Sequence, residues 1–578
     1  MSRFIFTNNR TYYDRINKIN VDCGFYISES LSKNYYFTNY KKCNVNNYNF
    51  CFVEDDFVAS VGTFLYKGMI GEKAYIEIYS DFKSKGVKYV RSNIVGTYAL
   101  FVKIGNIVNV FIDESGNYAL YYYEHNGEYI LTNLMYHIGL LTSDEIDKFA
   151  LLEELNEYCI LDNKTFFVNV KRLMANEVIE VDVNSSVVEV KPVECNEYYI
   201  QDHSFEGVVD LLAKTIVKYA RMQSVFGNEK MLFMTGGMDS RLTLAGDIAA
   251  DYKTILANWQ GSPDYMNTKK EDKEVSLKIA DAFGLDFVSI DVSNDELHTI
   301  NDLEYKTKGE YACIYGNNRL WHNFFAETNN YFFDFGYFGE TVKEWSPLEY
   351  KYHKNFTIDD YCELYMTRQK HDYCNLSHEE LQEYAENIKN KLKKICEDSK
   401  IDISNLSKED CMYLYYIYRT HADTKMVNFA NIYGYCFNIY AQKELIDYIN
   451  QCPYEYKRKG KLNLALTKKM CSELMSIPYY SHCQYINYDA SKMVLEAPNN
   501  DKISDQIKRI IPVWLKKKLK KIFRKNMKNV SIKLDIINKF DIKGIKESWL
   551  PQVDEDTYGL IGEYKSYYDY YVMLRELI

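Results

Sequence analysis

The sequence predicts an α+β antiparallel sandwich over roughly residues 1–200, followed over residues 201–578 by an α/β domain with a parallel sheet and a helical extension. Three observations carry this prediction. The 578 residues far exceed the length usual for one domain, so at least two hydrophobic cores are expected. Short β-branched and aromatic runs fill the region from Phe50 to Val193. After Ile200, helical and strand patterns alternate.

The composition limits the class of protein. Hydrophobic residues make up 47% and charged residues 26%, values typical of globular chains, which excludes a disordered or fibrous protein. The formal net charge of −11 disfavours a general nucleic-acid binder. Fourteen cysteines occur without a CxxC pair, so free thiols are expected instead of disulfides or a zinc site. With no signal peptide and no transmembrane segment in the pattern, we expect a cytoplasmic protein.

The expected strands of the first domain are short and separated by turn residues such as Asn106 and Gly127. This texture is typical of a mostly antiparallel sheet or sandwich. The runs are FCFV, VGTFLY, AYIEIY, TYALFVKI, IVNVFID, ALYYYEH, EYILTN, TFFVNV, NEVIEVDV and SVVEVKPV.

The second domain begins with a different pattern. Phe205 to Gln223 has apolar residues at helical spacing, and a strand, a glycine turn and another helix follow. The run TILANW, the helix EVSLKIADAFG and the run DFVSIDV continue the alternation, which predicts a parallel sheet with crossover helices. Residues 375–480 read as nearly all helix.

The glycine turn carries the clearest chemical signal. An apolar strand runs through Thr235, Gly236, Gly237, Asp239 and Ser240 into a helix. Glycines let backbone N–H groups approach an anion, the hydroxyls add donors, and the helix N-terminus adds partial positive charge. A carboxylate in such a loop would repel phosphate unless a divalent cation bridged them, so the pattern indicates a nucleotide with Mg²⁺. The alternative interpretation is a tight connection without a ligand.

This segment resembles the SGGxDS pyrophosphate loop of ATP pyrophosphatases of the asparagine synthetase type, with Thr235 in place of the first Ser. The stretch from Phe332 to Glu340 resembles the second phosphate loop of that family, with Gly336 at its first glycine and Glu340 where the family has a Mg²⁺-binding Asp. The resemblance implies an adenine nucleotide α-hydrolase-like (PP-loop) domain. It also implies ATP and Mg²⁺ as cofactors, with Phe233 among the residues beside the nucleotide and Asp239 and Glu340 as the metal ligands.

Stretches of the first domain resemble the class II glutaminase domain, which has an Ntn-type fold: Val95 to Phe101, Phe111 to Tyr122 and Ile130 to Asn133, with Thr165 to Asn176 resembling the segment that closes it. That family uses an N-terminal Cys as nucleophile and an early Arg to hold glutamine. This chain begins Met1-Ser2 and has no Arg between Arg15 and Arg91, and Val61 to Lys67 lacks the family's Asn. We therefore expect a glutaminase fold without glutaminase activity.

One cysteine complicates this interpretation. Cys23, with Gly24 and Phe25, resembles the start of a glutaminase, and removal of 22 residues would expose it. We interpret it as a buried strand cysteine instead.

Two residues are candidates for catalysis by resemblance. Tyr337 follows Gly336 where asparagine synthetases have Glu, as in β-lactam synthetase, whose Tyr helps deprotonate an amine. Chance occupancy is the alternative in a Tyr-rich chain, and Glu363 or Asp372 could be its carboxylate partner. The family's transition-state lysine falls on Lys461 after a two-residue shift, or on Asn463 without gaps.

The leading functional hypothesis is an ATP-dependent ligase that adenylates a small-molecule or peptide carboxylic acid, releases pyrophosphate and couples the acid to an amine. The amine could be intramolecular, as in β-lactam synthetases and lasso-peptide cyclases, or external. The rivals are a glutamine-hydrolysing asparagine synthetase or ammonia-using amidotransferase, and a degenerate synthetase kept as a binding subunit. A homodimer is a further possibility.

A basic segment, residues 505–530, lies near the end of the chain. Its helical pattern from Ile511 to Lys528 could dock on a carrier protein, an acidic peptide or a membrane surface, or could simply be a solvated surface helix.

Overall fold

The computed structural model of the chain describes residues 3–142, 147–157, 159–227, 229–260, 266–291, 325, 328, 330–368, 378–481, 484–489 and 494–496. The basic segment 505–530, the expected helix 511–528 and Asp372 lie outside these residues.

The first domain is a sandwich of two six-stranded sheets, and every strand pairing within each sheet is antiparallel. One sheet has the order β10-β8-β9-β1-β3-β2 and the other β12-β11-β7-β6-β5-β4. Their strands are β1 (Phe4–Thr7), β2 (Ile27–Ser32), β3 (Tyr36–Tyr40), β4 (Phe50–Val53), β5 (Asp56–Tyr66), β6 (Ile94–Ile104), β7 (Ile107–Ile112), β8 (Tyr121–His125), β9 (Glu128–Thr132), β10 (Lys171–Arg172), β11 (Glu177–Asp182) and β12 (Val187–Pro192).

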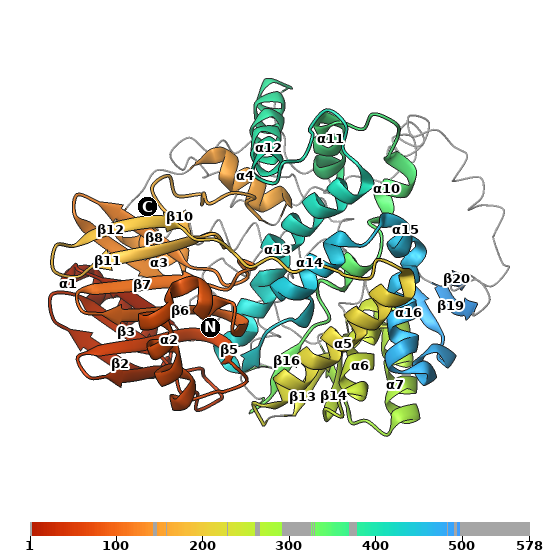
Figure 1. Cartoon of the computed structure of the whole chain (residues 1–578), viewed down its shortest axis with the longest axis horizontal. Helices are drawn as coiled ribbons and strands as arrows, with labels where there is room; N and C mark the ends of the chain where they lie inside the picture. Colours follow the sequence, from red (N-terminus) through yellow and green to blue (C-terminus); the bar gives the residue numbers. More distant parts are fainter. Residues whose placement is uncertain are drawn as a thin grey trace, which may run out of the picture.

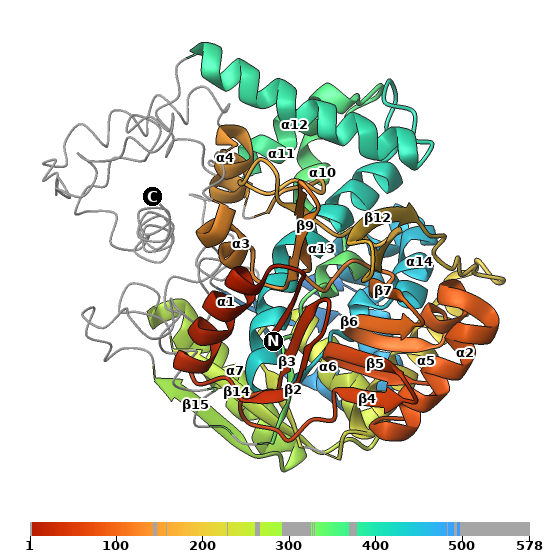
Figure 2. The same ribbon diagram turned by 90° about the vertical axis from the view of Figure 1, so that its left-hand side faces the viewer.

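Aromatic side chains from both sheets meet in the core of the sandwich. The ring of Phe101 on β6 lies 4.7 Å from that of Phe4 on β1 and 5.3 Å from that of Phe37 on β3, centroid to centroid. Helix α1 (Arg10–Asp22) covers the outer face of one sheet and α2 (Glu72–Arg91) the outer face of the other, which gives four layers (Figure 2). Under helix α2, the central strands β5 and β6 are buried along most of their length, whereas the edge strands β2 and β12 are largely exposed.

Two expected strands are wrong. The run AYIEIY lies inside helix α2, where Ala74, Tyr75, Ile78 and Tyr79 are buried. Their spacing of one, three and one residues fits one face of a helix, and this pattern overrides the β preference of Ile and Tyr. The run TFFVNV forms turns next to an isolated bridge between Lys164 and Lys171, not a strand. Helices α3 (Met135–Thr142) and α4 (Lys148–Glu157) precede it.

The second domain is built on a five-stranded sheet of order β15-β14-β13-β16-β17, parallel at every pairing. The expected sequence of an antiparallel sandwich followed by an α/β domain is therefore confirmed. The sheet strands are β13 (Lys230–Phe233), β14 (Thr254–Gln260), β15 (Phe287–Asp291), β16 (Phe332–Asp334) and β17 (Tyr435–Cys436), with helices α5 (Phe205–Ser224), α6 (Met238–Ala249) and α7 (Met266–Phe283) beside them.

The expected helical extension is present. Its elements are η2 (Gly339–Val342), α10 (Ser346–Lys351), α11 (Ile358–Arg368), α12 (His378–Asp398), α13 (Lys408–Tyr433), η4 (Ile439–Ala441), α14 (Lys443–Gln451), α15 (Tyr454–Lys457), η5 (Arg458–Gly460), α16 (Lys461–Met470) and η6 (Ser472–Ser476), followed by β18 (Tyr479–Ser481), β19 (Gln484–Asp489) and β20 (Val494–Glu496). No helix within the described parts of the chain is both long and apolar enough to span a bilayer.

Helix α13 runs between the sandwich and the parallel sheet (Figure 1). It begins with a capping box in which Ser407 and Asp410 satisfy each other's backbone N–H groups. At its other end, the N–H groups of Cys43 and Asn44 donate to the carbonyls of Ile432 and Tyr433, at 2.8 and 3.0 Å. The first domain is thus hydrogen-bonded to the last turn of this helix.

Candidate functional site

The glycine turn connects β13 to α6, as predicted. The hydroxyl of Ser240 accepts the N–H of Thr235 at 3.1 Å and lies 3.1 Å from the Thr235 hydroxyl. The N–H of Gly237 donates to Thr235 Oγ1 at 3.3 Å, and Gly237 caps α6 without a side-chain hydrogen bond. The structure therefore brings together Thr235, Gly237 and Ser240 around one helix N-terminus, an arrangement that suits an anion.

The second glycine loop, which follows β16, packs directly against the first. Gly336 has a φ of +66°, and a Cβ placed there would lie 2.9 Å from Ser240 Cα. A Cβ on Gly339 would lie 2.7 Å from Cβ of Asp239. Both positions need glycine because the backbones of the two loops touch.

Two predicted metal ligands are neighbours across these loops, and each binds a cation from this chain. Lys343 Nζ lies 2.5 Å from Asp239 Oδ2, and Arg419 Nη2 lies 3.0 Å from Glu340 Oε1 and 2.5 Å from Asp423 Oδ2. The pKa of Asp239 is raised, mainly because the carboxylate is buried. The positive charge of Lys343 opposes this rise, and the negative charge of Glu340 adds to it. Burial lowers the pKa of Lys343, but Asp239 and Glu340 reverse this and hold it above the ordinary value. The two carboxylates are therefore close enough to repel each other.

The predicted lysine lies elsewhere. Lys461 is the first residue of α16, and its Nζ sits 4.2 Å from the ring centroid of Phe205 on α5. Asn463, two residues on, faces the site instead: its Nδ2 lies 3.5 Å from Asp239 Oδ1, and its Oδ1 is buried without a hydrogen-bond partner. The ungapped match to Asn463 therefore agrees with the geometry, and the cation beside Asp239 is Lys343.

Phe233 and Tyr337 belong to one aromatic stack. The rings of Phe233 and Phe335 are 4.6 Å apart and nearly parallel, and Phe335 stacks on Tyr337 at 5.5 Å. The Phe233 side chain is buried in the core at the end of β13. Tyr337 is half-buried at the end of the stack, and its carbonyl accepts from Asn438 Nδ2 at 2.7 Å. Glu363, one suggested partner of Tyr337, is exposed on α11.

Sequence reasoning missed the residues that hold the first loop in place. Arg241 follows the motif and is fully buried, and its guanidinium donates to three carbonyls in the segment 474–478, at 2.6–3.1 Å. That segment leads into β18, where the N–H of Tyr480 donates to the carbonyl of Gly236 at 2.8 Å. Asp272 on α7 accepts the N–H of Gly236 at 2.8 Å. An Arg directly after a phosphate-loop motif was the one available signal.

A buried cluster of charged side chains lies at the strands that precede the two loops. Lys230 at the start of β13 lies 2.8 Å from Asp247 on α6 and 2.8 Å from Asp334 at the end of β16, and all three side chains are essentially unexposed. The other oxygen of Asp334 accepts the N–H of Gly336 at 3.1 Å. This cluster ties the strand before one loop to the strand before the other.

In the first domain, the stretch that resembles a glutaminase loop is packed against α13. Thr63 Oγ1 donates to Asn431 Oδ1 at 2.6 Å, and Lys42 Nζ donates to the same oxygen at 2.8 Å and to the Asn431 carbonyl at 2.9 Å. Cys23 lies at the C-cap of helix α1 and is half-buried, so the expectation of a buried strand cysteine is wrong. Removal of the residues before it would delete β1, which pairs with both β3 and β9.

Comparisons with known proteins give weak results. No protein-family model matches the chain, and no curated protein matches it. Among solved structures, it is similar to a glutamine phosphoribosylpyrophosphate amidotransferase from B. subtilis complexed with ADP and GMP, with 10% identity and a TM-score of 0.21 over 49% of this chain and 65% of that one. It is also similar to a structure of the allosteric regulatory enzyme of purine biosynthesis, with 9% identity and a TM-score of 0.21 over 49% of this chain and 64% of that one.

A third match is a glutamine-dependent NAD⁺ synthetase from Acinetobacter baumannii in complex with ADP, with 15% identity and a TM-score of 0.15 over 32% of this chain and 33% of that one. Each match spans less than two thirds of the other chain. At these identities and scores, the similarities contribute nothing to the functional argument.

Proposed function

We propose that the protein is an ATP-dependent carbon–nitrogen ligase that adenylates a carboxylic acid and transfers the acyl group to an amine. One observation carries the proposal: two glycine loops at the ends of adjacent parallel strands touch each other and present Asp239 and Glu340 side by side. The carboxyl ends of parallel strands are where α/β folds bind their ligands.

The donor set fits Mg²⁺. Asp239 and Glu340 supply hard oxygen ligands, and their mutual repulsion is relieved by a divalent cation. Among the described residues no cluster of three or more His, Cys, Asp or Glu could hold a metal alone. Two carboxylates completed by substrate phosphates are an ordinary Mg²⁺ site. The bound ion would neutralise charge on the phosphates.

The side chains of the two loops have distinct roles in this proposal. The hydroxyls of Thr235 and Ser240 and the N–H groups at the start of α6 bind the pyrophosphate portion of ATP. The acid's oxygen forms a bond to the α-phosphorus as the bond to pyrophosphate breaks. The amine nitrogen then bonds to the acyl carbon and AMP leaves. Tyr337, at the edge of the stack, takes part in removing the amine's proton.

Lys343, not Lys461, is the proposed cation for the charge that develops during adenylation. Its ammonium already lies at Asp239, it is mostly buried, and its pKa is held above the ordinary value, so it is charged at neutral pH. Lys461 is directed at the Phe205 ring on another helix.

In this proposal, the nitrogen does not come from hydrolysis of glutamine. Asn431 and Lys42 fill the space beside Thr63, in the stretch that resembles a glutaminase loop, and bind each other in a buried network. The amine is therefore supplied by the substrate itself, as in lactam closure, or by a separate amine.

A specific observation supports a second candidate, a catalytically inactive binding subunit. Both proposed metal ligands already have cationic partners without a metal: Lys343 pairs with Asp239, and Arg419 pairs with Glu340 as well as with Asp423. A synthetase fold that had lost its nucleotide would be stabilised by such pairs.

The test uses the full-length protein. Calorimetry measures ATP binding with and without Mg²⁺, and pyrophosphate exchange into ATP is then followed with a panel of amino acids and peptide acids. We expect Mg²⁺-dependent ATP binding and acid-dependent exchange, both lost in Asp239→Asn and kept in Asp210→Asn, a half-exposed site on α5 that pairs with Lys469. ATP binding without exchange for any acid favours the inactive subunit. No ATP binding at all refutes the ligase.

A further inference from the structure

Asn463 is a fully buried amide whose oxygen has no hydrogen-bond partner among the described residues. It lies in the first turn of α16, between the buried side chains of Leu462 and Leu464. Met238, which directly precedes Asp239 in the first glycine loop, packs against the apolar cluster that contains Leu464. The packing of α16 against α6 therefore holds this amide beside Asp239.

The two oxygens of Asp239 have partners of different strength. Lys343 Nζ lies 2.5 Å from Oδ2, a short contact between opposite charges, whereas Asn463 Nδ2 lies 3.5 Å from Oδ1. A separation of 3.5 Å is long for a hydrogen bond, so the amide contact stabilises Asp239 only weakly. The amide thus has one weak bond from its nitrogen and a buried oxygen that is left unsatisfied, which costs free energy.

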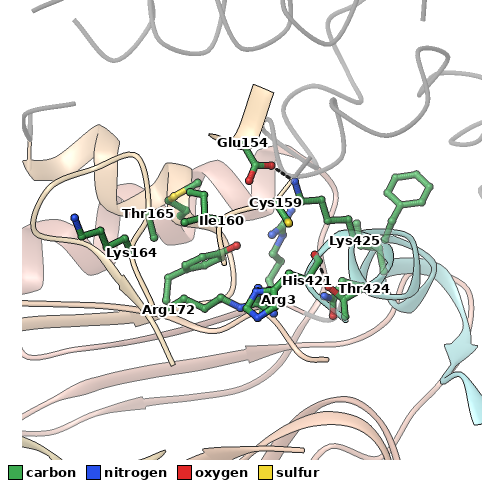
Figure 3. Close-up of a pocket in the computed structure, with 16 residues that line it drawn as sticks. Arg3, Glu154, Cys159, Ile160, Lys164, Thr165, Arg172, His421, Thr424 and Lys425 are labelled. Atoms are coloured by element: carbon green, nitrogen blue, oxygen red, sulfur yellow. Dashed lines mark hydrogen bonds and ion pairs between the residues drawn. The ribbon is translucent and has the colours of Figure 1, made fainter. Parts of the chain in front are cut away.

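The cavity between the sandwich and α13, drawn in Figure 3, gives a contrast. There, Lys425 pairs with Glu154, and Thr424 Oγ1 donates to the carbonyl of His421 at 3.2 Å. None of the residues that line this cavity belongs to the two glycine loops. These pairs need no ligand, whereas the oxygen of Asn463 would gain a partner from an ion or molecule bound beside Asp239.

The position of the amide suits a ligand of the ion that Asp239 would bind. Rotation about the last bond of the side chain brings Oδ1 to the place that Nδ2 holds now, because the two amide atoms are similar in size. Two oxygens that bind one Mg²⁺ at right angles lie roughly 3 Å apart, since each Mg–O distance is about 2.0–2.1 Å. The 3.5 Å between Asn463 Nδ2 and Asp239 Oδ1 is close to this value.

A neutral third ligand also suits the charge of the site. The carboxylates of Asp239 and Glu340 together balance the charge of one Mg²⁺. Among the described residues, no group of three His, Cys, Asp or Glu could hold a metal, so a third protein ligand there would be of another type. The amide oxygen of an Asn holds Mg²⁺ in protein kinases, where an Asp is also a ligand.

We propose that Asn463 Oδ1 is the third protein ligand of the Mg²⁺ ion that Asp239 and Glu340 bind together with ATP. This inference rests on the proposed function, because it requires that the two glycine loops bind Mg²⁺ with ATP. Without the ion, the Asn463 amide donates weakly to Asp239. With the ion, it turns its oxygen to the metal, and the change of partner adds no charge to the site.

The experiment measures ATP binding to the full-length protein by calorimetry over a series of Mg²⁺ concentrations, without an acid substrate. The Mg²⁺ concentration that supports half of the maximal ATP binding depends on the ligands of the ion. We expect it to rise at least tenfold in Asn463→Leu, which has nearly the same size but no oxygen, and less than threefold in Asn463→Asp, which keeps an oxygen. Thr424→Val is the control: it removes a buried hydroxyl away from the loops and should leave the Mg²⁺ dependence unchanged.

A spectroscopic signature comes from Mn²⁺ in place of Mg²⁺. In protein labelled with ¹³C-asparagine, electron–nuclear double resonance of the complex with Mn²⁺ and ATP should show a coupling to the amide carbon of a bound asparagine. This coupling should be absent from equally labelled Asn463→Leu and present in Thr424→Val. An amide that only donates to Asp239 would hold its carbon too far from the ion to give it.

Three results overturn the proposal: a Mg²⁺ dependence of Asn463→Leu equal to that of the wild type, a shift in Asn463→Asp as large as in Asn463→Leu, or no ¹³C coupling lost in Asn463→Leu. The second result would mean that only the N–H bond to Asp239 matters. If Asn463→Leu does not fold, Asn463→Asp and the coupling in the wild type decide. In all these cases the wild type still binds Mg²⁺ with ATP, so the ligase proposal stands, whereas a wild type that binds neither refutes both.

Discussion

Lys42 gives a pH-dependent stability that can be calculated from its surroundings. Lys42 is 2% exposed, and in the described contacts its ammonium donates only to neutral acceptors on Asn431, the carbonyl at 2.9 Å and Oδ1 at 2.8 Å. Burial lowers the pKa of Lys42 from 10.5 to about 7, with small opposing effects of Cys436 and Cys43. The folded protein therefore pays free energy to keep this group charged.

The number of protons bound to the folded and unfolded states decides whether stability rises or falls with pH. Between pH 7 and about 10.5 the unfolded chain holds a proton on Lys42 that the folded protein releases, so stability rises with pH across this window. Integrated between pH 7 and pH 9, the gain is about 2 kcal/mol. Below pH 7 the penalty levels off at about 5 kcal/mol.

The perturbation is Lys42→Met, which keeps the length of the side chain and removes the charge. Urea unfolding followed by circular dichroism at pH 6, 7, 8 and 9 gives the stability difference between Lys42→Met and the wild type. We expect the free energy of unfolding of Lys42→Met minus that of the wild type to fall by about 2 kcal/mol from pH 7 to pH 9, because only the wild type gains stability over this range. Lys41→Met, the neighbour bonded to Asn46, should show a difference that does not change with pH. A constant difference for Lys42→Met, or one that grows with pH, would show that folding does not lower the pKa of Lys42.

Three further changes test the described contacts. Gly336→Ala should lower stability by about 2 kcal/mol more than Gly68→Ala in urea unfolding: both have positive φ, but only Gly336 faces backbone within 3 Å. An equal loss would show that the loops can separate. Lys230→Met should cost about 3–5 kcal/mol by the same assay, because two buried carboxylates lose their cation, and a loss below about 1 kcal/mol contradicts this. Lys343→Met should slow acid-dependent pyrophosphate exchange by a factor of about 10²–10³. A larger loss in Lys461→Met would show that Lys461, the lysine predicted from the sequence, stabilises this charge instead.

Local patterns were sufficient for much of the fold. Alternating helix and strand signals after Ile200 predicted the parallel sheet, and the Gly236-Gly237 turn was placed between the correct strand and helix. The helix α2 was missed because a run of Ile and Tyr satisfies strand preference and helical spacing at once. Pattern alone does not decide such a segment, because tertiary burial does.

The charges around the candidate site could not be predicted in the same way. Arg419 reaches Glu340 across 79 positions of sequence, and Lys343 reaches Asp239 across 104. Lys343 lies only three residues past Glu340, yet no spacing rule marks it, since its position follows from the 3₁₀ turn η2. Sequence similarity suggested a lysine on α16, but the helix begins so that Asn463, not Lys461, faces Asp239.

The charges at the glycine loops also distinguish an enzyme from a binding subunit. Without any ligand, Asp239 pairs with Lys343, and Arg419 pairs with both Glu340 and Asp423. If Mg²⁺ and triphosphate enter together, the carboxylates exchange their cations for the metal and the two cations gain phosphate oxygens, so no charge loses a partner. Mg²⁺ alone would displace Lys343 from Asp239 without supplying a new anion for it, and ATP alone adds negative charge beside two carboxylates. Strong interdependence of ATP and Mg²⁺ binding is therefore the signature of the ligase, whereas a purely structural set of ion pairs would bind neither.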